Sequence, residues 1–235
     1  MAQEVLNHIM HSNGLQDPNI RYFQRPAQQC SGDFIAAARD PYGHLRIMLA
    51  DVTGHGLQAA LFLLPIFRIF YTMVRKGLST QNIVTEINDI MREISITGRF
   101  IAAVVVRITQ DGTSLEVWNG GVAVAFYVQN DGAIHKFHSQ HPPLGLVEAE
   151  GFDTSTETIY PPPGSLVLCS DGLTEAENTY GEPFGEERLE TVLRTSSQDT
   201  LLDDLLLVAD THLAGDLPHD DLSIVVAHVP RGTSV

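Results

Sequence analysis

The chain has 235 residues, of which 43% are hydrophobic and 18% charged, a composition that excludes a disordered protein and suffices for a full hydrophobic core. It carries 29 acidic residues against 14 Lys and Arg, a formal net charge of −15, so repulsion from phosphates excludes a general nucleic-acid or anionic-membrane binder. Without a signal-peptide pattern, an apolar run near the about 20 residues of a membrane span, or more than two cysteines, it is expected to be cytoplasmic.

The first 20 residues are polar, except for apolar residues at helical spacing between positions 5 and 10. We predict here either a short terminal helix with a loop or the end of a linker from an upstream domain. No linker rich in proline, glycine or serine divides the remainder. Residues 21–230 are therefore predicted to form one domain, followed by a tail at 231–235.

Strands and helices are predicted in groups. A turn at residues 39–44 separates two strands, and the apolar stretch from Gly56 to Val74 predicts a buried helix that Pro65 kinks. A second helix begins near Ser79 or Thr80, either of which can cap it. The remaining elements are strands at 101–106, 113–118, 123–129 and 133–137, a proline-rich connection over 139–164, a strand at 165–170, helices at 186–195 and 201–213, and a strand at 222–229. Hairpins with paired helices indicate an α+β layered fold rather than alternating βαβ units.

Acidic residues recur where these buried strands begin or end. Asp33 starts the strand at 33–38, Asp51 follows the strand at 45–50, Asp171 follows a third strand, and Asp220 with Asp221 precedes the last one. A carboxylate at the end of a buried strand is costly unless it is paired, and Lys and Arg are scarce nearby. The pattern favours a Mg²⁺ or Mn²⁺ site, an arrangement suited to phosphate hydrolysis. Any single one of these residues is more typical of a turn, so the prediction rests on the pattern as a whole.

Six segments together resemble the bacterial branch of the metal-dependent protein phosphatases (the PPM, or protein phosphatase 2C-like, family), and within it the SpoIIE/RsbU type. They occur in the order of that family and cover nearly the whole chain: RPAQQCSGDF (25–34), ADVTGHGLQAAL (50–61), PPLGL (142–146), LCSDGLTEAEN (168–178), FGEERL (184–189) and HDDLSIVV (219–226). The resemblance implies a four-layer αββα sandwich of two antiparallel sheets flanked by helix pairs. Output domains of response-regulator proteins of the RssB kind are similar.

The resemblance also implies a site for two Mn²⁺ or Mg²⁺ ions and a set of ligands. Asp51 resembles the bridging ligand, and the main-chain oxygen of Val52 falls at a ligand position. Asp33 would belong to one metal, and Asp171 and Asp220 to the other. The implied reaction is hydrolysis of phosphoserine or phosphothreonine on a protein, with a metal-bound hydroxide attacking the phosphorus and no covalent intermediate.

Further residues are candidates for contacts around that site. Thr53 could bind a metal-bound water or cap the following helix, and His55 is either a general acid or a polar turn residue. Gly172 and Asp221 would lie beside the ligands. Arg25 is a candidate for contacting the substrate phosphate, with a surface role as the alternative.

Two departures from the family pattern are visible. Related phosphatases carry a further acidic residue after the first motif, where this chain has Ile35 and Ala36, and an Asn-Ala-Gly-His sequence where this chain has Asn119-Gly120-Gly121-Val122. Neither change removes one of the four matched aspartates. The departures concern substrate docking, loop shape and affinity for one metal.

Three functions follow as hypotheses. The first is a phosphatase acting on a phosphorylated anti-sigma-factor antagonist, as the output of an upstream receiver or sensor domain, either monomeric or dimeric. The second is a pseudophosphatase that uses the same fold as a protein-binding module. The third is a phosphatase of nucleotides or small esters, which the absence of a P-loop sequence and of a basic cluster disfavours.

Overall fold

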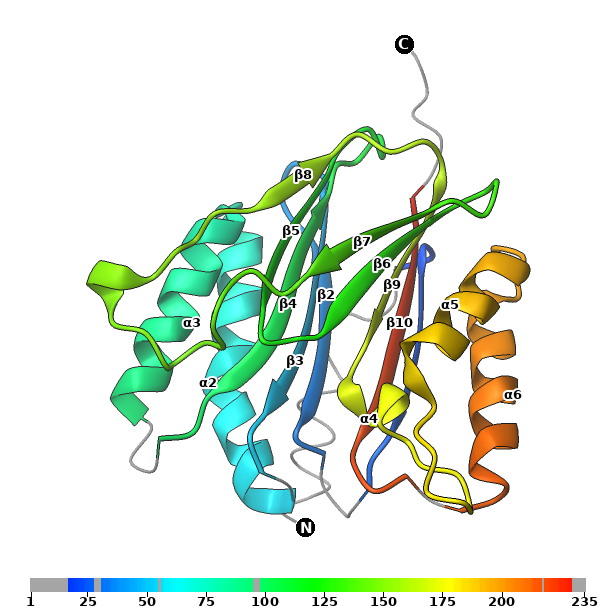
Figure 1. Ribbon diagram of the computed structural model, residues 1–235. Coiled ribbons are helices and arrows are strands. Elements are labelled where there is room, and N and C mark those ends of the chain that lie inside the picture. Colours follow the sequence, from blue (N-terminus) through cyan, green and yellow to red (C-terminus); the bar gives the residue numbers. More distant parts are fainter. Residues whose placement is uncertain (1–16, 28–30, 55, 95–97, 217, 230–235) are drawn as a thin grey trace.

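The computed structural model describes residues 17–27, 31–54, 56–94, 98–216 and 218–229 (Figure 1). Ten strands form two antiparallel five-stranded sheets. One sheet has the order β1-β10-β9-β6-β7, with bounds Ile20–Arg25, Leu222–Val229, Gly164–Cys169, Val124–Gln129 and Ile134–His138. The other has the order β2-β3-β4-β5-β8, with bounds Asp33–Arg39, Leu45–Val52, Ile101–Ile108, Leu115–Gly120 and Glu157–Ile159.

The two sheets face each other, and a helical layer covers the outer face of each (Figure 1). Helices α2 (Gly56–Arg75) and α3 (Thr80–Ile94) cover the sheet that contains β3. Helices α4 (Asp171–Thr174), α5 (Gly185–Thr195) and α6 (Leu201–Leu213) cover the sheet that contains β10. A short 3-10 helix spans Ala149–Gly151.

Strand alternation produces this four-layer arrangement. Successive side chains of a strand point to opposite faces, so each fully buried strand supplies two cores. Along β3, Ile47 and Leu49 enter the core between the sheets, whereas Met48 and Ala50 pack against α2 and α3. A third core joins the other sheet to α5 and α6.

Most of the predicted elements are present, with some additions and one correction. Strands β1 and β8, helix α4 and the 3-10 helix were not expected from the sequence. Helix α2 runs continuously through Pro65, but it is not buried on all sides, because Leu61 is 51% exposed. In α3 the expected apolar stripe faces the sheet, and the hydroxyl oxygen of Ser79 accepts a hydrogen bond from the Asn82 amide. The expected helix before residue 17 lies outside the described residues.

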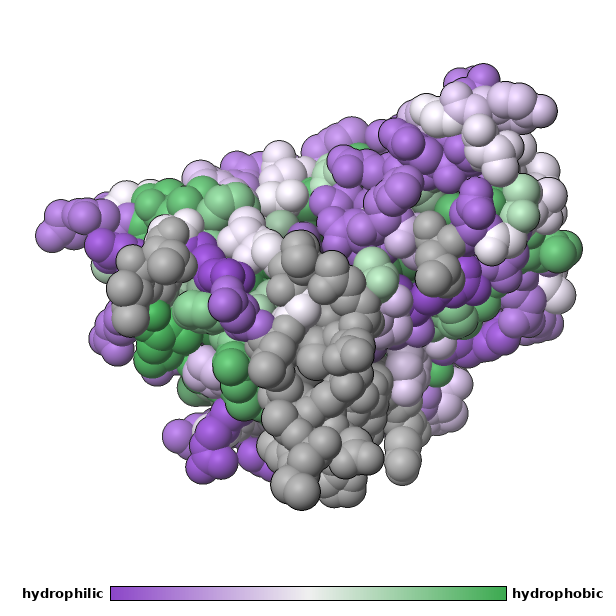
Figure 2. Space-filling model, turned by 90° about the horizontal axis from the view of Figure 1, so that it is seen from below, coloured by the Kyte–Doolittle hydropathy of each residue, from purple (hydrophilic) through white to green (hydrophobic). Residues whose placement is uncertain are grey.

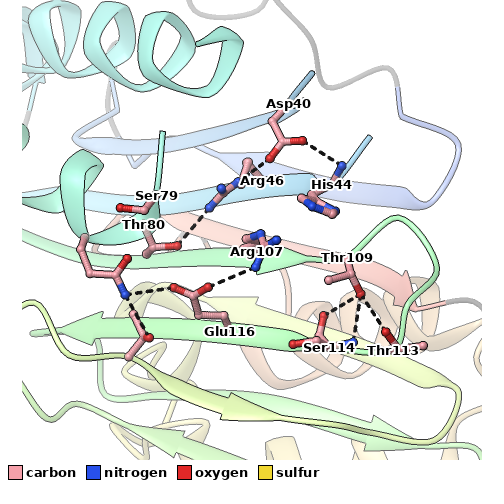
Figure 3. A network of polar contacts seen from close by, with 12 residues as sticks. Asp40, His44, Arg46, Ser79, Thr80, Arg107, Thr109, Thr113, Ser114 and Glu116 are labelled. Carbon is pink, nitrogen blue, oxygen red and sulfur yellow. Dashed lines mark hydrogen bonds and ion pairs between the residues drawn. The ribbon is translucent and has the colours of Figure 1, made fainter. Parts of the chain in front are cut away.

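A buried polar network occupies the end of the β2-β3 hairpin far from Asp51 (Figure 3). The Asp40 carboxylate accepts a hydrogen bond from Nε of Arg46 at 3.2 Å, and both side chains are almost fully buried. The Arg46 guanidinium also donates to the Thr80 hydroxyl and to the Leu78 carbonyl, both at 3.1 Å. This network ties the start of α3 to the sheet.

Candidate metal-binding site

Two of the predicted aspartates lie opposite each other on neighbouring strands. Asp33 begins β2 and pairs in register with Asp51 near the end of β3. Asp33 is only 1% exposed, and its Oδ2 atom has no hydrogen-bond partner. Burial, followed by the Asp51 and Asp221 charges, raises the pKa of Asp33 well above its usual value, although the nearby hydroxyls of Ser223 and Ser170 oppose the shift.

The other two predicted aspartates come from the facing sheet. Strands β9 and β10 are antiparallel neighbours, so the residues after β9 adjoin the residues before β10. Ser170 fixes that junction, because its amide donates to the Ser223 carbonyl and its hydroxyl to the Asp221 carbonyl, both at 3.0 Å. Asp171 and Asp220, both exposed, therefore lie on the same edge of this sheet.

Electrostatics join the two pairs into one site. Burial and then the charges of Asp171, Asp220 and Asp221 raise the pKa of Asp51 to about 7. Burial and the Asp220 charge raise the pKa of Asp171. The carboxylates from both sheets therefore act on one another at one end of the sandwich. Figure 2 looks at the molecule from that end, where hydrophilic surface is extensive on the side of α5 and α6.

A divalent cation suits this set of donors. Each raised pKa reports negative charge that the protein alone leaves uncompensated, and the unpartnered Asp33 oxygen is a buried donor. Within the described ranges, no three Asp, Glu, His or Cys side chains form a group that could hold an ion by themselves. A Mg²⁺ ion is normally bound through one or two carboxylates and keeps several waters, which matches a partial set of this kind.

Asp221 supports the site through the main chain. Its Oδ1 accepts a hydrogen bond from the Ala27 amide at 2.7 Å, and its Oδ2 accepts one from the Gly32 amide at 2.6 Å. The carboxylate thus holds the segment that leads into Asp33 against the start of β10. Both oxygens already have protein partners, which favours the expected role beside the ligands.

The chain packs very closely at Gly172, the residue that follows Asp171. A Cβ atom at Gly172 would be 2.1 Å from the main-chain oxygen of Asp221, a distance that backbone atoms cannot accommodate without moving. Glycine is therefore needed for close packing of α4 against the start of β10. Nothing in this contact requires a ligand.

We expect Gly172→Ala to separate Asp171 from Asp220 and to lower the affinity for Mn²⁺. Overpacking costs typically 1–3 kcal/mol, so the melting temperature should fall by roughly 2–12 °C in a chain of this size. Calorimetric titration with Mn²⁺ and thermal unfolding measure the two effects. Gly151→Ala is the matched control, because Gly151 is exposed, also lacks a positive φ, and an added Cβ there meets only Val147 at an ordinary 3.6 Å. Equal Mn²⁺ affinity in Gly172→Ala and wild type would contradict the expectation.

The remaining predicted residues fall in different places. The Thr53 hydroxyl receives a hydrogen bond from the Phe100 amide at 3.2 Å, so it holds the start of β4. Arg25 donates to Asp210 of α6 at 2.8 Å and lies over the Phe23 ring, so its guanidinium is paired within the protein. His55 lies outside the described residues.

Sequence reasoning missed Arg99. Its guanidinium donates to the Thr53 carbonyl at 2.9 Å and to Oε1 of Gln58 at 3.0 Å. Arg99 is separated from Asp51 by 48 positions and belongs to none of the motifs, so no sequence pattern pointed to it. Only the pairing of β3 with β4 brings the two segments together.

Comparison with known proteins gives consistent results. The family model described as Stage II sporulation protein E (SpoIIE) matches residues 41–230. Phosphoserine phosphatase RsbP of Bacillus subtilis is 23% identical over 176 residues, which cover 71% of this chain and 43% of RsbP. Phosphoserine phosphatase RsbU of the same organism is 25% identical over 209 residues, covering 86% of this chain and 60% of RsbU. The chain thus spans less than two thirds of either relative.

A solved structure confirms the expected sandwich. The SiaA-PP2C domain of Pseudomonas aeruginosa superimposes with a TM-score of 0.82 and 18% sequence identity, over 97% of this chain and 94% of that one. At this identity the likeness concerns the fold. Among the described residues, no helix has the length and apolar character needed to cross a membrane.

Proposed function

We propose that this chain, which belongs to the SpoIIE family, is a metal-dependent protein serine/threonine phosphatase domain. The observation that carries the proposal is that Asp33, with a buried and unpartnered Oδ2, lies opposite Asp51 on the neighbouring strand. Aspartates of the facing sheet lie close enough to help raise the pKa of Asp51, after burial, to about 7. A site that concentrates negative charge in this way is suited to bind cations and, through them, an anionic phosphate.

Divalent ions bound here would neutralise the phosphoryl oxygens and lower the pKa of water. Asp51 and the Val52 carbonyl, Asp33 across the β2-β3 pair, and Asp171 and Asp220 from the facing sheet are the proposed ligands. Each protein group has a separate task. The aspartates bind and orient, Asp221 holds the segment before Asp33, and Ser170 holds the junction before Asp171.

The proposed substrate is a phosphorylated protein of the anti-sigma-factor antagonist type, and the proposed control comes from an upstream receiver or sensor domain. Two relatives are phosphoserine phosphatases by name, and this chain spans less than two thirds of each. The proposed ions are Mn²⁺ or Mg²⁺, two of them.

A catalytically silent binding module is the second candidate. The observation in its favour is that, among the described residues, no three candidate side chains form a group able to hold an ion. This candidate predicts the same fold and protein partners but neither metal binding nor hydrolysis.

Mn²⁺-dependent hydrolysis of a phosphoserine peptide by wild type and by Asp171→Asn tests the proposal. We expect activity that requires metal and falls at least about 100-fold in the variant, since even residues that only support a metal ligand cost 10–100-fold. Asp203→Asn is the matched control. Asp203 lies on α6 and forms an exposed ion pair with Arg21, so this variant should retain full activity. Calorimetry in the same samples separates the candidates, because a wild-type protein that neither binds Mn²⁺ nor hydrolyses the peptide is the silent module.

A further inference from the structure

The chain leaves β3 immediately after the two proposed ligands, and the start of β4 fixes it there. The Thr53 amide donates to the Phe100 carbonyl at 3.1 Å. The Phe100 amide donates in return to the Thr53 hydroxyl at 3.2 Å. The Val52 carbonyl and the Thr53 amide share one planar peptide group, in which C=O and N–H point in opposite directions. Because the Thr53 amide points to β4, the Val52 oxygen must point away from β4.

On the side away from β4, the Val52 oxygen faces the segment that leads to Asp33. The Val52 amide donates to the Gly32 carbonyl at 3.1 Å, and a Cβ atom at Gly32 would be 3.2 Å from the Val52 oxygen. The direction of the Val52 carbonyl therefore follows from how its peptide group is held. The next peptide group, which carries the Thr53 carbonyl, is held by Arg99.

Arg99 contacts both the loop and the helix that follows it. Besides its bonds to Thr53 and Gln58, its guanidinium lies over the Phe62 ring, 5.3 Å from the ring centre. The planar, rigid guanidinium of an arginine suits simultaneous contact with a loop and a helix, because its donors keep a fixed geometry. One side chain thus connects the loop after Asp51 to the first two turns of α2.

Gly54 makes this approach possible. Its φ angle is +95°, and a Cβ atom there would be 2.9 Å from Nη1 of Arg99. The glycine in the DVTGHG motif is therefore needed both for its backbone angle and for the room it leaves to Arg99.

The main chain around Arg99 is itself anchored. Ile101 and Leu144 exchange two main-chain hydrogen bonds of 2.9 and 2.8 Å, which fasten the start of β4 to the proline-rich segment. The Gly145 amide then donates to Oδ1 of the buried Asn88 in α3 at 2.9 Å. Arg99 thus extends from an anchored segment toward the loop.

We infer that Arg99 is a positioning residue that holds the loop after Asp51 in the conformation that binds metal. The inference deepens the proposed function and rests on it for the metal, but the loop contact itself requires none. Its assigned role is to keep the Thr53 carbonyl in place and so to limit rotation of the neighbouring Val52 peptide. A substrate-binding role is the competing assignment.

The test compares the full chain with Arg99→Met and Arg99→Lys, and uses Arg194→Met as the control. Arg194 lies on α5, beside the other sheet, and forms an exposed pair with Glu190. Hydrogen exchange is measured first, on metal-free protein. In Arg99→Met we expect the amides from Thr53 to Phe62 to exchange about tenfold faster, a local opening of the loop and first helical turns. The control should exchange as wild type does.

Mn²⁺ affinity by calorimetry and inhibition by inorganic phosphate at saturating Mn²⁺ complete the test. We expect about tenfold weaker Mn²⁺ binding in Arg99→Met, a smaller loss in Arg99→Lys, which can keep one of the two hydrogen bonds, and unchanged phosphate inhibition. Exchange and Mn²⁺ affinity within twofold of wild type would overturn the inference, as would phosphate inhibition weakened alone. If the wild type binds no Mn²⁺, the proposed function fails, and the exchange data still decide the role of Arg99.

Discussion

Metal-free protein should lose stability as the pH rises from about 4 to about 7, and Asp51→Asn should remove much of that loss. The pKa of Asp51 is about 7 in the folded chain and 3.8 as a free side chain, so the folded state binds its proton more tightly. A raised acid pKa contributes stability that is complete below the unfolded value and is lost as the pH rises through the folded value. The asparagine variant has no charge to bury and avoids this loss.

Thermal unfolding of both proteins in chelator at pH 4, 6 and 8 measures this effect. At pH 8 the variant should melt several degrees higher than wild type, since each kcal/mol corresponds to about 2–4 °C in a chain of this size. At pH 4 the difference should be small. The raised pKa of Asp33 leaves some pH dependence in the variant. A variant that melts lower than wild type at pH 8 would show that Asp51 is stabilising without metal.

Added Mn²⁺ should reverse the order. A ligand that binds only the folded state at 100 times its Kd stabilises it by about 2.7 kcal/mol. Wild type should gain this stability at pH 8, and Asp51→Asn should gain little, together with a loss of phosphatase activity of at least about 100-fold, as for Asp171→Asn. Asp203→Asn again serves as the matched control, with wild-type stability, metal response and activity.

Asp40→Ala should produce the largest loss of stability outside the site. It leaves the Arg46 guanidinium, 3% exposed, without its buried partner, which typically costs 3–5 kcal/mol. It also removes the acceptor for the Tyr42 and His44 amides in the hairpin turn. The melting temperature should therefore fall by roughly 6–20 °C.

Two further variants identify the cause. Asp40→Asn keeps an acceptor for the turn but removes the charge, and should lose less than alanine. Asp40→Ala combined with Arg46→Met removes both charges and should recover part of the loss, because a buried pair replaced by apolar groups is often neutral. Activity per folded molecule should not change, since the network lies at the other end of β2 and β3. A double variant less stable than Asp40→Ala would refute the unpaired charge as the cause.

The predictable part of the fold is the part with strong local signals. Largely apolar strands such as β4 and β10, and the apolar stripe of α3, are visible in a single sequence. Strand β1 has mixed composition and only one buried residue, Ile20, so its place at the sheet edge comes from pairing with β10. The three residues of β8 form a strand only because β5 is available as a partner.

The candidate site likewise has a part that the sequence predicts and a part that it does not. The aspartates could be predicted because each one adjoins a recognisable strand. Contacts between distant segments could not, because neither the Asp221 bonds to the Ala27 and Gly32 amides nor the Arg99 bond to Thr53 leaves a local pattern. Both Gly54 and Gly172 were visible as glycines, but the atoms that require them belong to Arg99 and Asp221.

The pairing of β1 with β10 has a consequence for the order of folding during synthesis. Ile20 pairs with Ala227, so the first strand of the sheet must wait for the last strand to leave the ribosome. In the other sheet, β2, β3, β4 and β5 each pair with the next strand along the chain, so this part can form earlier. Asp33 and Asp51 are thus in place first, and Asp220 arrives with the final strand. A nascent chain that has not yet released β10 lacks Asp220, so its proposed metal site is incomplete.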